Sequence, residues 1–127
     1  MVEFTVKNEV FELTEVMKSK FTAFIVPVNT VDEFKTRVEQ IRKANPKARH
    51  VVYAYRIGVS SKSTDDKEPK GTAGRPLLEL LNKKNLNNTA IIVVRYYGGV
   101  QLGAGRLLRT YVTSAVNAIN KAELIEL

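Results

Sequence analysis

The sequence predicts an α+β domain, a two-layer α/β sandwich in which helices cover one face of a mixed sheet of four to five strands. Segments with strand and helix periodicity are mixed along the chain in the order ββαβαβα. The first two strand segments resemble a hairpin, which argues against a purely parallel sheet. The 127 residues are 44% hydrophobic and contain no linker or low-complexity segment, which predicts one domain with a modest core.

Three strands and one helix are predicted in the first part of the chain. The strands cover residues 4–6, 11–16 and 21–28, the first two as a pair. A helix follows from about residue 31 to 44, because Thr30 can cap its N-terminus and the charges of its two ends match the helix dipole. Its buried stripe is expected to contain Phe34, Val38 and Ile41.

The middle of the chain alternates strongly apolar and polar segments. Residues 50–57 are rich in β-branched and aromatic side chains and predict a strand. Residues 58–70 are polar, with almost no core-forming side chain, and predict the most mobile loop. A turn at residues 71–74 leads into a helix, with Pro76 suited to its first position.

The last two elements are a strand and a helix. Residues 90–97 form the most apolar segment, which predicts a central strand. The final helix is expected from about residue 104 to 121. Its predicted buried face comprises Leu108, Tyr111 or Val112, Ala115 and Ile119, and a second face carries Arg106, Arg109, Thr113 and Asn117.

Composition excludes several classes of site. The chain has no cysteine, which rules out disulfides, a thiol nucleophile and cysteine-ligated zinc or iron–sulfur centres. His50 is the single histidine, so it is more typical of a hydrogen-bonded structural residue than of a metal ligand, and neither metal nor cofactor is expected. There is no secretory signal and no apolar run long enough to span a membrane, so we expect a cytoplasmic protein without membrane contact.

The positive charge is confined to one part of the chain. Residues 70–121 contain eight basic side chains and one acid, whereas the rest of the chain has twelve of each sign. The excess therefore equals the whole net charge of +7 and lies in the glycine-rich half. This distribution favours a polyanionic partner. The alternative is that these side chains simply solvate exposed helix faces.

The glycine-rich segment RYYGGVQLGAGRLLR, residues 95–109, is the strongest candidate site. It joins a strand to a helix, and free amides at a helix N-terminus attract anions. The predicted anion site comprises Gly103, Gly105, Arg95, Arg106 and Arg109. A dinucleotide fingerprint is not present, because Leu108 occupies the place of its third glycine. The alternative, favoured for Gly98 and Gly99, is that glycine permits close packing of the helix on the strand.

A second turn, GTAGRP, also leads into a helix and adds Gly71, Thr72, Gly74 and Arg75 to the predicted phosphate-binding residues. Lys18, Lys20 and Lys70 are expected at the rim of the site. The sequence does not show whether the two turns meet. Tyr53 and Tyr55 share one strand face, so both stack on bases or both belong to the core.

The acids Asp65, Asp66 and Glu68 could bind Mg²⁺ or act as acid and base. Three carboxylates within four loop residues are more typical of a solvated loop, and that interpretation is favoured.

Four motifs resemble the N-terminal domain of the Impact/YigZ family. They occur in the family's order: KSKF (residues 18–21), ARHVVYAYRIG (48–58), DDKEPKGTAGRP (65–76) and VRYYGGVQLGAGRLLRTY (94–111). The resemblance implies a fold like domain IV of elongation factor G and related ribosomal-protein domains. Bacterial members usually carry a second, ferredoxin-like C-terminal domain, so residues 1–127 are expected to be the first domain alone.

Three positions depart from the family pattern towards positive charge. Lys67 stands where the family usually has glycine between two acids, Lys70 replaces a small residue, and Arg106 replaces a glycine. These changes favour anion binding over metal binding by the loop acids.

The resemblance implies a role in translation, as eukaryotic relatives regulate it by competing for the activator of an initiation-factor kinase. Our leading hypothesis is a non-enzymatic RNA- or ribosome-associated binding module. The alternatives are a protein-binding regulator of the Impact type and a Mg²⁺-dependent hydrolase or phosphotransferase using the loop acids. The last ranks lowest, because no nucleophile–base pair is evident.

Overall fold

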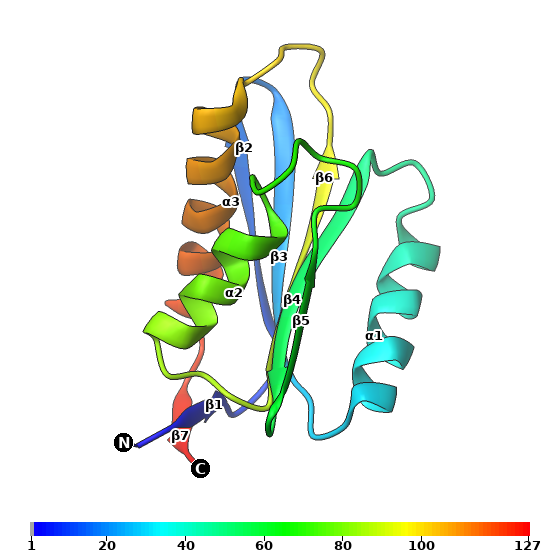
Figure 1. Ribbon diagram of the computed structural model, residues 1–127. Coiled ribbons are helices and arrows are strands. Elements are labelled where there is room, and N and C mark those ends of the chain that lie inside the picture. Colours follow the sequence, from blue (N-terminus) through cyan, green and yellow to red (C-terminus); the bar gives the residue numbers. More distant parts are fainter. Residues whose placement is uncertain (1) are drawn as a thin grey trace.

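The computed structural model describes residues 2–127 as a five-stranded sheet with helices on both faces and a small two-stranded sheet at one end (Figure 1). The helices are α1 (Val31–Ala44), α2 (Gly74–Lys83) and α3 (Ala104–Ile119). The strands are β1 (Phe4–Val6), β2 (Val10–Val16), β3 (Ser19–Pro27), β4 (His50–Ile57), β5 (Ser60–Thr64), β6 (Thr89–Tyr96) and β7 (Leu124–Glu126). The predicted α+β class is confirmed.

The large sheet has the order β2-β3-β6-β4-β5, and every neighbouring pair is antiparallel. The prediction of a mixed sheet is therefore wrong. The reason is β5, which reverses the chain after β4 in a segment predicted to be a mobile loop. β5 consists of serine, lysine and threonine, so its sequence carries no apolar alternation from which a strand could be predicted.

The strand pairing at the N-terminus also differs from the prediction. β1 pairs with β7, and β2 pairs with β3, so β1 and β2 do not form a hairpin. β7 begins five residues after the end of α3 and lies within a segment for which no strand was predicted. It forms because β1 supplies a partner from the opposite end of the chain.

Helices cover both faces of the sheet, because the two central strands are apolar on both faces. Seven of the eight residues of β6 are buried. α2 and α3 cover one face around Phe21, Val93 and Leu77, whereas α1 covers the other around Ile92 (Figure 1). The expectation that all helices share one face is therefore wrong, since α1 forms a third layer.

Individual core predictions had mixed outcomes. On α1, the predicted stripe of Phe34, Val38 and Ile41 is buried. Tyr53 and Tyr55 belong to the core, where both rings pack on Phe34 at 4.8 and 4.7 Å between centroids, so they are not base-stacking residues.

On α3, Leu107 is buried and the predicted Leu108 is 37% exposed. The two neighbours point to different sides of the helix, and only the contact with the sheet decides which is inside. None of the helices in residues 2–127 is long and apolar enough to cross a membrane.

Candidate functional site: a buried charge cluster beneath a basic pocket

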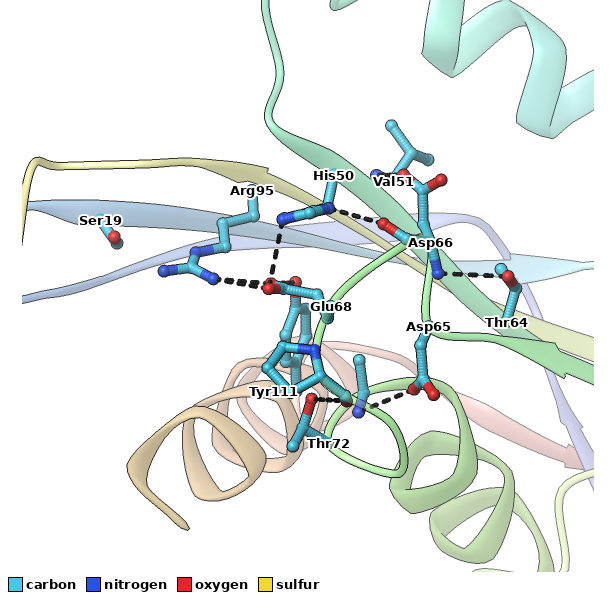
Figure 2. A network of polar contacts seen from close by, with 12 residues as sticks. Ser19, His50, Val51, Thr64, Asp65, Asp66, Glu68, Thr72, Arg95 and Tyr111 are labelled. Atoms are coloured by element: carbon cyan, nitrogen blue, oxygen red, sulfur yellow. Dashed lines mark hydrogen bonds and ion pairs between the residues drawn. The ribbon is translucent and has the colours of Figure 1, made fainter. Parts of the chain in front are cut away.

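Glu68 is the centre of a buried polar cluster between the loop before α2, the sheet and α3 (Figure 2). Its carboxylate accepts hydrogen bonds from Nη1 of Arg95, on β6, at 2.9 and 2.7 Å. Both side chains are buried, with residue exposures of 7% for Glu68 and 5% for Arg95. The predicted solvated loop is therefore wrong, because the loop is drawn into the protein by a charged residue that requires a partner.

Two further side chains complete this cluster, named here the Glu68 cluster. Tyr111 of α3 donates its hydroxyl hydrogen to Glu68 at 2.5 Å, and Nε2 of His50 lies 3.2 Å from the other carboxylate oxygen. Burial, and secondarily the hydrogen bond to Glu68, raises the pKa of the Tyr111 phenol, so the hydroxyl stays protonated and remains a donor.

The other two loop acids have structural roles. The Asp66 carboxylate accepts the backbone N–H of Val51 at 2.7 Å, at the start of β4. The Asp65 carboxylate accepts the backbone N–H groups of Gly71, Ala73 and Gly74 at 2.9, 3.1 and 2.8 Å. Asp65 thus caps the N-terminus of α2 in the way that an N-cap residue does, although it lies nine residues before Gly74 in the sequence.

Asp65 therefore occupies the anion position predicted at the GTAGRP turn. The amides of Gly71 and Gly74 are bound to its carboxylate, and Thr72 is buried with its hydroxyl donating to the Pro69 carbonyl. A side chain added at Gly74 would lie 2.6 Å from the Thr64 carbonyl oxygen, so this glycine permits close packing of α2 on β5. The turn has its own internal anion, which contradicts its prediction as a phosphate cradle.

Asp65→Ala is expected to lower the free energy of unfolding by about 2 kcal/mol, the upper end for a helix cap, since three amides lose their acceptor. Urea unfolding followed by circular dichroism measures the change. Asp32→Ala is the matched control, as Asp32 lies in the first turn of α1 and caps no amide there. Equal losses in the two variants would contradict the capping role of Asp65.

The three loop acids do not converge on a common point. Asp65 binds α2 amides, Asp66 binds β4, and Glu68 binds Arg95. Within residues 2–127, no group of three or more histidine or acidic side chains has the arrangement of a metal site. This geometry argues against the predicted Mg²⁺-dependent chemistry, because each carboxylate would have to leave a protein partner to bind a cation.

A pocket of about 420 Å³ opens above the Glu68 cluster. It is called here the Glu68 pocket, and its lining includes Arg49, His50, Lys67, Glu68, Arg95, Tyr97, Leu102, Gly103 and Leu107. A depression of similar size, about 450 Å³, lies beside α1, but none of the residues lining it is a buried charged residue. The Glu68 pocket is thus the cavity in which buried charge meets solvent.

The glycine-rich segment forms one wall of this pocket. Gly103 has φ +78° and precedes α3, whose N-terminus is not capped by a side chain. Gly98 has a different role, because a Cβ there would lie 2.1 Å from the Lys18 carbonyl carbon. Gly98 is therefore a packing residue, but it packs on the β2–β3 turn and not between a helix and a strand as predicted. The packing interpretation is wrong for Gly99, where φ is +89° and the space around a Cβ is open.

Gly98 packs against the backbone of Lys18, so the β2–β3 turn lies beside the segment that leads into α3, and the β2–β3 hairpin and α3 carry four basic side chains. These are Lys18 and Lys20, beside the β2–β3 turn, and Arg106 and Arg109 on α3. All four are exposed, and Arg106 donates to the sulfur of Met17 in that turn. With Arg49 and Lys67 at the pocket, these side chains constitute what we call the basic end.

The remaining predicted residues lie elsewhere or are engaged. Arg75 is exposed and pairs with Glu79 one turn further along α2. Lys70 is an exposed loop residue. Arg95 is not a free surface cation, because it is buried against Glu68.

The predicted set of phosphate-binding residues did not include Arg49, His50 and Tyr111, whereas Lys67 was recognised as a charge that favours anion binding. The three residues lie far in sequence from the side chains that they contact: Arg49 from Tyr97, His50 from Glu68, and Tyr111 from Glu68, the last pair being separated by 43 residues. The sequence signal for His50 is its position as the first residue of a predicted strand. In the structure His50 pairs in register with Arg95, at the end of β6 where the glycine-rich segment begins.

A model of the Impact N-terminal domain matches residues 17–119. The chain belongs to this family. It is 39% identical over 126 residues to the IMPACT family member YvyE of Bacillus subtilis, covering 97% of this chain and 58% of that protein. It is 38% identical over 102 residues to YigZ of Escherichia coli, covering 76% and 50%. Human Protein IMPACT is 36% identical over 95 residues, covering 70% and 30%.

A crystal structure of a hypothetical protein has the same fold. The TM-score is 0.94 with 30% sequence identity, covering 99% of this chain and 64% of that one. The chain spans 58% or less of the length of the three relatives named above.

Proposed function

We propose that this Impact domain is a non-enzymatic RNA- or ribosome-associated module that takes part in regulating translation and contacts phosphate through its basic end. Membership of the Impact family supports the link to translation. The charge and the geometry of the basic end support the phosphate contact.

The observation that carries the proposal is the convergence of basic side chains from separate segments. The β2–β3 turn, the residue before β4, the loop before α2 and the start of α3 each contribute, through Lys18, Arg49, Lys67 and Arg106 respectively. The uncapped N-terminus of α3 adds its dipole. Clustered cations that release counterions supply most of the affinity of a protein for nucleic acid.

The arginines of α3 carry most of the expected affinity. Arg106 and Arg109 are exposed and present guanidinium groups that can bind phosphate with two hydrogen bonds. Lys20 is expected to contribute less, because Glu15 lies opposite it on β2.

The double variant Arg106→Glu with Arg109→Glu is expected to weaken RNA binding by more than about tenfold at near-physiological salt, since two phosphate contacts become repulsive. Fluorescence anisotropy with labelled structured RNA, at several salt concentrations, measures the affinity and its salt slope. The matched control is Lys83→Glu with Lys84→Glu, which makes the same charge change at the far end of α2. Equal losses in both variants would mean that only overall charge matters.

A protein-binding regulator remains the second candidate, and one feature favours it. β2 is an edge strand, and its Phe11 and Leu13 lie on the sheet face that carries α1, where they are 61% and 50% exposed. Exposed apolar side chains on a free strand edge suit a protein partner. A partner captured from lysate that survives nuclease and moderate salt would support this candidate, and loss of all partners on nuclease treatment would count against it.

A further inference from the structure

Arg95 has donor capacity that the protein does not use. Its Nη1 binds Glu68, whereas its Nε is buried and has no hydrogen-bond partner among residues 2–127. Its guanidinium carbon lies 5.3 Å from the Phe21 ring centroid and 5.7 Å from that of Tyr97, and Arg95 lines the Glu68 pocket. A buried donor without an acceptor costs free energy, and Arg95 is one of the residues that line the pocket, so an acceptor bound beside its guanidinium would relieve that cost.

The floor of the pocket also holds the ring of His50. Nδ1 of His50 lies 2.6 Å from the Asp66 carbonyl oxygen, which can only accept, so Nδ1 carries a proton. Nε2 lies 3.2 Å from a Glu68 carboxylate oxygen. The carboxylate of the floor is already engaged by Arg95 and Tyr111, so it does not neutralise the cations at the rim of the pocket.

The pocket rim adds further positive charge and an apolar wall. Arg49, whose guanidinium carbon lies 4.9 Å from the Tyr97 ring centroid, and Lys67 are both exposed at the opening. Gly103 and Ala104, at the N-terminus of α3, line the same space. Tyr97, Leu102 and Leu107 line the wall beside the charges. The pocket therefore combines an anion site with a surface for a planar or apolar group.

We infer that the Glu68 pocket binds a phosphomonoester carried by a nucleoside, either a free mononucleotide or the terminal phosphate of an RNA. This inference rests on the proposed function and names the part of the nucleic acid that is read. Near neutral pH a phosphomonoester carries nearly two negative charges, against one for an internal phosphodiester. A terminal phosphate can enter a pocket with one opening, whereas an internal phosphate requires space for the nucleotide chain on both of its sides. Tyr97, Leu102 and Leu107 offer the nucleoside an apolar wall beside the phosphate site.

The test compares one labelled RNA sequence with a 5′-phosphate, a 3′-phosphate or hydroxyl ends, and uses AMP and inorganic phosphate as competitors. We expect either the 5′-phosphorylated or the 3′-phosphorylated RNA to bind about tenfold more tightly than the hydroxyl-ended RNA. The reason is that the terminal phosphate accepts additional charge-assisted hydrogen bonds. AMP is expected to compete better than inorganic phosphate, since only AMP contacts the apolar wall. Competition by both to the same extent would contradict the nucleoside part of the inference.

Lys67→Gly is the decisive variant. Lys67 has φ +68°, a conformation that glycine adopts without strain, so the variant should fold and lose only a cation. It is expected to weaken the binding of both RNAs, since Lys67 belongs to the basic end, and to reduce the preference for phosphorylated RNA at least about threefold. Lys70→Gly, an exposed position three residues away, is the matched control and should keep the preference.

The outcomes separate the two proposals. Equal binding of phosphorylated and hydroxyl-ended RNA would overturn the pocket inference and leave the RNA-binding module standing. Direct binding of AMP without any RNA binding would support a mononucleotide site and overturn the proposed function. Binding of neither would overturn both.

Discussion

Glu68→Ala is expected to lower the free energy of unfolding by about 3–5 kcal/mol, because it leaves the buried guanidinium of Arg95 without its carboxylate. The Tyr111 hydroxyl also loses its acceptor. Equilibrium unfolding in urea measures the loss, and an unchanged slope with denaturant would show that the two-state transition is preserved.

Two comparisons test the origin of this loss. Glu79→Ala removes an exposed carboxylate from its ion pair with Arg75 and should change stability little. Glu68→Leu with Arg95→Met removes both charges, and it should cost clearly less than the sum of the two single variants, because neither charge is then buried alone. An additive result would show that the pair is not coupled and would contradict this account of the cluster.

Gly98→Ala is expected to destabilise the domain by about 3 kcal/mol or more, the upper range for overpacking. The added Cβ would lie 2.1 and 2.3 Å from the carbonyl carbon and oxygen of Lys18 and 2.5 Å from the amide nitrogen of Ser19. These are backbone atoms of the β2–β3 hairpin, which cannot rotate away. The Gly98 amide also donates to the Ser19 hydroxyl at 3.1 Å, and displacement would break that bond.

Gly105→Ala is the matched control for this prediction. Gly105 lies in the first turn of α3, and the nearest atom to an added Cβ is a flexible guanidinium nitrogen of Arg109 at 3.4 Å. Alanine should therefore stabilise the helix, by about 0.5–1 kcal/mol. Thermal unfolding of the two variants compares them directly. A similar loss in both would mean that glycine flexibility, and not contact with the hairpin, explains residue 98.

Much of the fold could be predicted from local patterns. β4 covers the residues predicted for it, and the Thr30 capping box begins α1 as expected. β6 is the middle strand of the five, as its apolar sequence indicated. These elements could be recognised because their side chains alternate, recur at helical spacing, or match the chemistry of a helix end.

Elements that depend on distant partners could not be predicted in this way. β5 and β7 have no strand pattern of their own and exist because β4 and β1 offer them hydrogen-bonding edges. The face on which α1 packs was equally undetermined, because an amphipathic helix shows that it has a buried side but not which surface it covers.

The candidate site divides in the same way. Sequence alone identified the glycine-rich turn before α3, the basic residues beside it and the family, since each is a property of contiguous residues. The tertiary structure decided that Asp65 fills the second turn, that Gly98 is a packing residue, and that Glu68 and Arg95 form a buried pair. The physical reason is that burial and pairing depend on which segments meet. The same charged residue type contributes little to stability when it is exposed to solvent, but it destabilises the core when it is buried without a partner.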